Sequence, residues 1–215
     1  MAYSFGHVRS SFLDAISTEH KYAGIPLKLG WSVKRSRVAY SGRFPVIEDV
    51  LVADLDGRET LYTYLGMDSR AVSILAHDGR GSILTVREYR HPIGRVITDL
   101  PIGSVHPDES SREAARRELR EETGYDAGEL VHFGTVFPLP ALALLALDYY
   151  FATDLTRVQA DPDATEILEA EWMVFDEVLA KVMAGELQHG SLPHAAVLAT
   201  QKGLVQPSSS RGPRG

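Results

Sequence analysis

Short runs in which apolar and polar residues alternate recur along the chain from position 37, and this pattern is typical of half-buried β strands. It predicts strands over residues 37–40, 46–55, 59–65, 71–76, 82–88, 130–137, 147–154 and 170–175. Asp56-Gly57 and the stretch from His77 to Gly81 are turn signals between consecutive strands, whereas residues 89–99 read as a loop. The pattern therefore indicates a chain rich in β strands.

The apolar spacing becomes helical over Glu109–Glu122, with Gly124 placed as the C-cap. Further helices are predicted from Asp176, as N-cap, to about Ala184, over His194–Lys202, and over a short segment at Ser10–Ile16. Strands on both sides of a central helix, with another helix near the end, favour an α/β/α sandwich with a mixed sheet. The early strands add an N-terminal antiparallel β segment before it.

Composition narrows the classes of function. The 215 residues carry a net charge of −7, so no overall positive field attracts nucleic acid or an anionic membrane. The chain has no cysteine, which excludes disulfides, thiolate metal sites and a thiol nucleophile. No secretory signal is visible, and the longest apolar run, Leu139–Leu147, is too short to span a bilayer. We expect a cytoplasmic enzyme with neither a nucleic acid nor a membrane partner.

Three carboxylates crowd one face of the central predicted helix, because Glu118, Glu121 and Glu122 stand at helical spacing. Each like-charged neighbour costs roughly 0.2–0.5 kcal/mol in a helix. A divalent cation would offset this cost, and carboxylate oxygens are the ligands that Mg²⁺ or Mn²⁺ prefers. The alternative is a solvated helix face, on which Glu113 and Arg117 form an ordinary salt-bridged pair.

The spacing around these acids resembles the Nudix box. The matching positions are Gly103, Glu109, Arg117, Glu118, Leu119, Glu121, Glu122 and Gly124, and Tyr125 replaces the usual aliphatic residue at the last position. The segments 86–94 and 100–103 are similar to the approach to the box in ADP-ribose pyrophosphatases, and 44–65 resembles their N-terminal strands. The chain is thus identified as a Nudix hydrolase similar to ADP-ribose pyrophosphatases.

This resemblance implies an organisation and a homodimer. We expect an N-terminal extension with a β segment over residues 1–66, a Nudix hydrolase domain over 67–205 and a disordered tail over 206–215. The tail is rich in Ser, Pro, Gly and Arg. In the resembling enzymes, strands like those of the first segment commonly exchange between two subunits.

The resemblance also implies the roles of the box residues. Glu118 and Glu122 would be the principal metal ligands, with the backbone carbonyl of Ile102 completing the shell. Glu121 would assist catalysis, and Arg117 would orient the carboxylates. The cofactor is expected to be Mg²⁺, with Mn²⁺ as the alternative.

One more acid is expected from a later loop, as general base or metal ligand. Glu166 fits best, with Asp161, Asp163 and Glu169 as the other candidates. Many ADP-ribose enzymes carry a Glu where this chain has Ala164, so the general base stays open between Glu166 and Asp163.

The expected reaction is hydrolysis of a nucleoside diphosphate linked to a sugar, ADP-ribose first, to AMP and ribose 5-phosphate. Arg90 is a candidate clamp on the phosphates or terminal ribose, because its planar fork matches phosphate oxygens; the alternative is a surface Arg. Two departures bear on the substrate: Asp99 replaces a usual Glu, and the segment 141–145 is apolar where the family often has an acid. The alternatives are a GDP- or UDP-sugar, a dinucleoside polyphosphate, or a non-catalytic ligand sensor.

Overall fold

The computed structural model describes residues 30–42, 44–159, 168–187 and 189–206. Several expectations lie outside these ranges: the helix predicted at Ser10–Ile16, the tail beyond Gln206, and the loop acids Asp161, Asp163 and Glu166. Within the described ranges, no helix is long and apolar enough to cross a membrane. The described residues fall into two compact units, which divide the chain near residues 40, 46 and 63.

Among the described residues, the first unit is built from strands and the turns between them. The strands are β1 (Trp31–Tyr40), β2 (Val46–Ala53) and the first part of β3 (Glu59–Ala76), in the order β1-β2-β3. The predicted turn at Asp56-Gly57 is confirmed, since the amide of Gly57 donates to the carbonyl of Ala53 at 2.9 Å and Gly57 has a φ of 71°. Gly tolerates this left-handed conformation without steric cost.

The second unit holds two sheets. In one, the later part of β3 runs parallel to β8 (Ala143–Arg157) and antiparallel to β6 (Ile102–Ser104), and β7 (Tyr125–Val136) is antiparallel to β8. The other has the order β5-β4-β9, formed by Arg95–Asp99, Ser82–Arg90 and Leu168–Val174.

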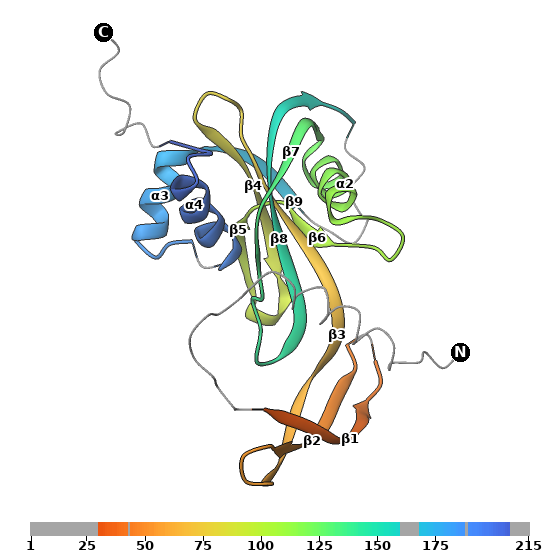
Figure 1. Ribbon diagram of the computed structural model, residues 1–215. Coiled ribbons are helices and arrows are strands. Elements are labelled where there is room, and N and C mark those ends of the chain that lie inside the picture. The colour runs from red at the N-terminus through yellow and green to blue at the C-terminus, as the bar shows by residue number, and fades with distance from the viewer. Residues whose placement is uncertain (1–29, 43, 160–167, 188, 207–215) are drawn as a thin grey trace. The chain divides into compact units, whose positions relative to one another are not determined.

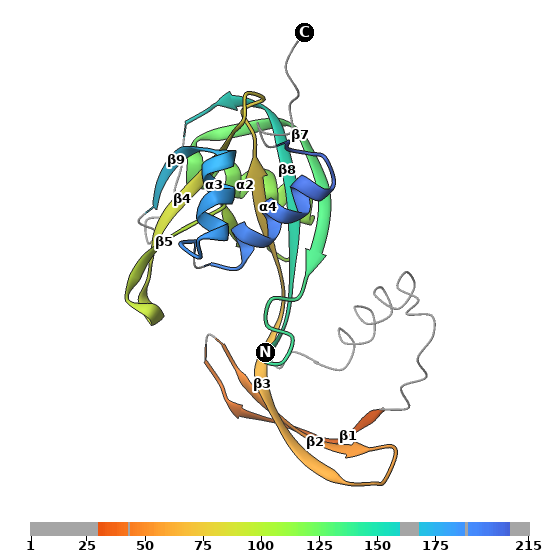
Figure 2. The same cartoon turned by 90° about the vertical axis from the view of Figure 1, so that its left-hand side faces the viewer.

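Helices cover both sides of these sheets. Figure 1 shows α2 (Ser111–Thr123) on one side, with α3 (Phe175–Met183) and α4 (Ser191–Gln201) on the other. Figure 2 views the same unit from the side of α3 and α4. Two buried apolar clusters match these layers, one that includes residues of α2 and one that includes residues of α3 and α4. The predicted α/β/α sandwich with a mixed sheet and N-terminal strands is confirmed.

Several predicted strand boundaries were wrong. β3 is one strand across residues 59–76, where two strands were expected, and its pairing with β8 shifts register between Leu65 and Asp68. The strands β1, β7 and β8 are longer than predicted. Residues 89–99 are not a plain loop, because they contain the end of β4, a 3₁₀ turn at His91–Ile93 and β5. The alternation of apolar and polar side chains is weak in these segments, so a prediction based on alternation makes the strands too short or misses them.

The helix starts also differ from the prediction. Asp176 is not the N-cap of α3, since buried Phe175 already belongs to the helix and Val174 precedes it. α4 starts at Ser191 rather than at His194, because Pro193 is tolerated in the first turn of a helix. Both errors are within three residues and leave the order of elements unchanged.

Candidate active site

The α2 helix is held at both ends by its own sequence. Ser110 and Glu113 form a capping box: the amide of Glu113 donates to Oγ of Ser110 at 3.3 Å, and the amide of Ser110 donates to Oε2 of Glu113 at 2.8 Å. The helix therefore begins at Ser111, two residues later than predicted. Ala114 and Leu119 are fully buried against the sheet. Gly124 ends the helix in the left-handed conformation, with φ 70°, as predicted.

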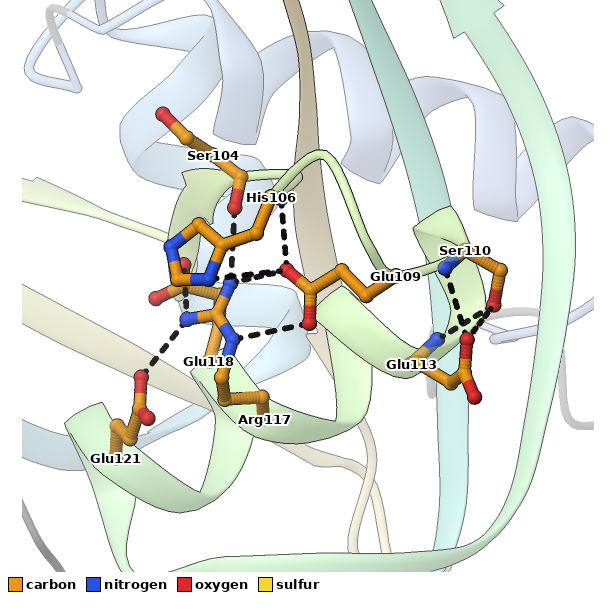
Figure 3. Close-up of polar contacts among 8 residues, drawn as sticks. All are labelled: Ser104, His106, Glu109, Ser110, Glu113, Arg117, Glu118 and Glu121. Carbon is orange, nitrogen blue, oxygen red and sulfur yellow. Dashed lines mark hydrogen bonds and ion pairs between the residues drawn. The ribbon is translucent and has the colours of Figure 1, made fainter.

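Arg117 lies at the centre of the box and bonds to the groups around it (Figure 3). Its Nη1 donates to Oε1 of Glu118 at 2.8 Å and to Oε2 of Glu121 at 2.9 Å. Its Nη2 donates to the carbonyl oxygen of Ser104 at 2.8 Å and to Oε1 of Glu109 at 2.7 Å. One guanidinium thus ties the loop before the helix to two carboxylates on the helix.

These contacts set the charge state of the group. The hydrogen bond from Arg117 holds the pKa of Glu109 below its ordinary value of 4.5, against the opposing effect of burial, and the amide of His106 lowers it further. Hydrogen bonding to Glu109, and then to Glu118, raises the pKa of Arg117. The pair is therefore fully ionised at neutral pH.

Two carboxylates of α2 contact the main chain of β6, one at Gly103 and the other at the preceding Ile102. Glu118 is buried, and its carboxylate lies so close to Gly103 that any Cβ at that position would overlap it. The amide of Ile102 donates to Oε2 of Glu122 at 3.2 Å. The structure thus brings together four box residues to which the resemblance gave a role, Arg117, Glu118, Glu121 and Glu122, and Ile102, which directly precedes the box.

The donor set fits a divalent cation. Glu109, Glu118 and Glu121 share the single positive charge of Arg117, so negative charge is in excess among these four side chains. Their oxygens are the hard ligands that Mg²⁺ and Mn²⁺ prefer. Within the described part of the chain, no group of three Asp, Glu or His side chains is arranged to hold a metal ion. In this arrangement two of the carboxylates point their oxygens at Arg117 instead.

The other candidate residues pair with different partners or lie outside the described ranges. Arg90, at the end of β4, pairs with Glu88 of the same strand, with Nη2 2.7 Å from Oε2. Glu169 in β9 is exposed and pairs with Arg87, Nη1 to Oε2, at 3.0 Å. Glu166 belongs to residues 160–167, of which the structure describes nothing.

A buried polar cluster around Asp99 was missed by the sequence reasoning. Oδ1 of Asp99 accepts from the amide of Leu100 and from Oγ of Ser191, both at 2.8 Å. Nδ1 of His189 contacts Oδ2, although not in hydrogen-bonding geometry. Oγ of Ser73 lies 3.2 Å from Oγ of Ser191. The sequence did point to Asp99, because it replaces the usual Glu. Its hydroxyl partner, Ser191, stands 92 positions later, so the sequence alone did not pair the two residues.

Comparison with known proteins agrees with this geometry. The chain is 28% identical to the ADP-ribose pyrophosphatase of Bacillus subtilis over 138 residues, which cover 63% of this chain and 75% of that protein. It is 32% identical to the ADP-ribose pyrophosphatase of Mycobacterium tuberculosis over 144 residues, 64% of this chain and 69% of that protein. A hydrolase of Streptomyces rubellomurinus that acts on a CMP-linked phosphonate is 30% identical over 160 residues, 72% of this chain and 75% of that protein.

The fold and the family model point the same way. A solved structure described as an ADP compounds hydrolase superposes with a TM-score of 0.74 at 21% identity, and covers 81% of this chain and 95% of its own. Residues 67–193 match the NUDIX domain, and this segment contains the whole Arg117-centred group. The chain therefore belongs to the NUDIX family and is a Nudix hydrolase.

Proposed function

We propose that this protein hydrolyses the pyrophosphate bond of a nucleoside diphosphate linked to a sugar, with ADP-ribose as the first candidate. The observation that carries the proposal is the meeting of Glu118 and Glu122 with the main chain of β6, beside the charge network of Arg117. Two relatives, aligned over 63% and 64% of this chain, are named ADP-ribose pyrophosphatases. The expected products are AMP and ribose 5-phosphate.

A divalent cation, used typically across the family, would be held by Glu118, Glu122 and the carbonyl oxygen of Ile102. When bound, Mg²⁺ or Mn²⁺ would neutralise charge on the phosphates and make water more acidic. Arg117 keeps Glu118 and Glu121 in place through the two Nη1 hydrogen bonds, and a side chain fixed in this way loses little entropy on ligand binding. Glu109 in turn anchors Arg117 to the loop before the helix.

The reaction needs a group that takes a proton from water. The water oxygen bonds to one phosphorus, the bridging oxygen leaves with the electron pair of its P–O bond, and the base accepts the proton of the water. We assign this role to Glu166, with Asp163 as the alternative. Glu121 is the further catalytic carboxylate of the box, and Arg90 would bind a phosphate or the terminal ribose once released from Glu88.

A second candidate function follows from Leu145. It lies in β8, within the segment where ADP-ribose enzymes often carry an acid, and it lines a cavity beside Tyr149. The loss of an acid there favours a different nucleoside diphosphate, such as a GDP- or UDP-sugar or a dinucleoside polyphosphate.

The test is a hydrolysis screen coupled to alkaline phosphatase. That enzyme releases inorganic phosphate from the monophosphate products but not from intact diphosphate esters, so phosphate reports cleavage. ADP-ribose, a GDP-sugar, a UDP-sugar and a dinucleoside polyphosphate are compared with Mg²⁺, with Mn²⁺ and with a chelator. The protein is removed by filtration before alkaline phosphatase is added together with excess Zn²⁺ and Mg²⁺, because the chelator would otherwise inactivate that enzyme. Cleavage of ADP-ribose with the highest kcat/KM, dependent on metal, supports the first proposal. Preference for another compound selects the second, and no cleavage of any compound rejects both.

A further inference from the structure

A cleft of about 380 Å³ lies within the second unit and is lined by the turn from β3 to β4, the start of β7, the end of β8 and part of β9. Figure 1 shows that turn and the end of β8 at the same end of the unit. Among the lining residues are His77, Asp78, Tyr125, Asp154 and Trp172. None of the described residues in its wall belongs to the Arg117-centred group. The cleft is therefore separate from the candidate active site, and its volume suits a small ligand, for which roughly 300–1,000 Å³ is usual.

Tyr125 is the residue at which this chain departs from the Nudix box, and it forms part of the wall. It follows Gly124, the C-cap of α2, where the box usually has an aliphatic residue. The ring centroids of Tyr125 and Trp172 are 5.5 Å apart, with the rings at 84°. Nε1 of Trp172 donates to the phenol oxygen of Tyr125 at 3.4 Å. An aliphatic side chain would offer neither a π face nor a partner for the indole.

Two carboxylates, those of Asp78 and Asp154, line the same cleft. Oδ1 of Asp78 accepts three amides of the turn, those of Arg80, Gly81 and Ser82, at 2.7, 3.0 and 2.9 Å. Burial raises the pKa of Asp78, but these amides lower it more, so it lies below its ordinary value of 3.8 and the group is ionised at neutral pH. The described lining contains no Lys or Arg, so its charged side chains are both negative.

Asp154 also has an unusual backbone. Its φ of 54° is the one positive φ of a non-glycine residue in the part of the chain that the structure describes. Only Gly, Asn and Asp visit this region routinely, and residues held in sparsely populated conformations concentrate at functional sites and ligand clamps. The exposed side chain of Asp154 forms no hydrogen bond or ion pair with another described residue. Local bonding therefore does not account for an acid at this position.

The lining favours a flat organic cation. The two carboxylates repel a phosphate, and a bare divalent cation would find no further ligands on the faces of aromatic rings. A guanidinium suits both kinds of wall, because it is planar, stacks on aromatic faces and binds a carboxylate through two N–H groups. The protein itself gives an example, since the guanidinium of Arg157 lies over the ring of Tyr125, 5.7 Å from its centroid.

We propose that this cleft is a second binding site, for a guanidinium group whose N–H groups bond to Asp78 and Asp154 and whose plane lies against Trp172. The indole is the available ring, because Trp172 is 38% exposed whereas Tyr125 already contacts Arg157. Tyr125 then acts by orienting the indole through their hydrogen bond. The guanidinium belongs either to a small molecule or to an arginine side chain of a partner protein.

The direct test follows the indole N–H signals by NMR. The chain has two tryptophans, Trp172 in the cleft and Trp31 in the first unit, so each spectrum contains its own control. Trp31→Phe assigns the two signals. Butylguanidinium is titrated into the full chain, with the neutral isostere butylurea as the matched ligand. We expect the signal of Trp172 to move with a Kd on the order of 1 mM, the signal of Trp31 to stay, and butylurea to move neither.

Three results would overturn the proposal. The first is an unmoved signal of Trp172 at concentrations about tenfold above that Kd. The second is an equal response to butylurea, which would show an apolar cleft without preference for a cation. The third is a response to Mg²⁺ alone that abolishes the response to butylguanidinium, which would show a metal site.

Asp154→Asn is the sharpest variant, because Asn also adopts the left-handed conformation and the change removes only the charge. It should weaken binding of butylguanidinium about threefold to fivefold, the upper range for an exposed ion pair. Glu129→Gln removes the same charge from an exposed acid of β7 that does not line the cleft, and it should bind as wild type. Equal weakening in the two variants would show general attraction to an acidic protein and overturn the assignment.

Tyr125→Leu restores the aliphatic residue of the box and removes the partner of the indole. Binding should weaken about fivefold or more, since the indole is no longer held in place. Unaltered binding by folded Tyr125→Leu would overturn the role of the aromatic wall, and Asp154→Asn keeps the proposal open to disproof if this variant does not fold.

Two further ligands distinguish the sources of the guanidinium. Arginine amide represents a small molecule, and a blocked peptide with one central arginine represents a partner protein. Binding of the peptide roughly tenfold tighter than the amide assigns the cleft to a protein partner, whereas equal or tighter binding of the amide assigns it to a small molecule. Failure of both to move the signal of Trp172 would overturn the proposal.

Discussion

Arg117 and Glu109 form a two-point ion pair across the loop that precedes α2, with Nε 3.2 Å from Oε2 and Nη2 2.7 Å from Oε1. Such a pair fixes the plane of the guanidinium as well as its position. Because Nη1 of the same side chain bonds Glu118 and Glu121, the orientation of both carboxylates depends on Glu109. Glu109, which is not among the proposed metal ligands, thus controls the geometry of Glu118, which is one of them.

Glu109→Gln should destabilise the protein by about 1–2 kcal/mol at pH 7, since it replaces charge-assisted hydrogen bonds with weaker ones. The pKa of Glu109 is lowered in the fold, so its stabilisation is complete above the ordinary value of 4.5 and is lost as the pH falls below it. The difference in unfolding free energy between wild type and variant should therefore shrink in acid. Urea denaturation at several pH values measures it, with Glu129→Gln on β7 as the control. A difference that is constant with pH would contradict the ionic role of Glu109.

Glu122→Gln should abolish most turnover, on the order of 10²-fold or more, because a neutral amide is a poor ligand for Mg²⁺. The fold should persist, since Gln still offers an oxygen to the amide of Ile102. Thermal stability in metal-free buffer should stay equal or rise slightly, as one of the crowded charges is removed. Exposed Glu129→Gln again serves as the control. Turnover near wild type in Mg²⁺ would reject the assignment of the metal site.

Glu166→Gln should lower kcat by on the order of 10²–10⁴-fold if Glu166 is the base, the usual contribution of a positioned acid–base group. KM should change much less, because the lost interaction belongs mainly to the transition state. Asp163→Asn, in the same loop, is the matched comparison and should be nearly silent. The opposite pattern in steady-state kinetics would assign the base to Asp163.

The protein is expected to be a homodimer built partly by its N-terminal strands. All residues of β1 are exposed in the single chain, including Trp31, Val33 and Val38, and exposed apolar strands commonly pair with another chain. Light scattering at micromolar concentration should give twice the chain mass of 23.6 kDa. Deletion of residues 1–65 should yield a poorly soluble or inactive protein. A fully active species with the mass of one chain would exclude this arrangement.

The box could be predicted from sequence because its contacts are local. Arg117 and Glu121 stand four positions apart on α2, so helical spacing brings them together without knowledge of the fold, whereas Glu109 lies in the loop directly before the helix, eight positions from Arg117. Ile102 and Glu122 meet through the loop between β6 and α2, which the motif spacing also implies.

The Asp99 cluster shows where sequence reasoning ends. Asp99, Ser73 and Ser191 come from β5, β3 and the start of α4, and only the packing of α4 against the sheet brings them together. Neither the alternation of apolar residues nor the spacing of motifs carries that information. The cavity beside the cluster follows from the same packing, so it also becomes visible only in three dimensions.

The box requires glycine at positions 103 and 124 for different physical reasons. Gly124 is needed for its positive φ, and a D-alanine at that position would adopt the same backbone without strain. Gly103 is absent from the positive-φ glycines among the described residues, and it is needed because the carboxylate of Glu118 fills the space of a side chain. A semisynthetic protein should therefore accept the mirror-image residue at position 124, where the requirement concerns handedness. At position 103 the requirement concerns the volume beside the acid.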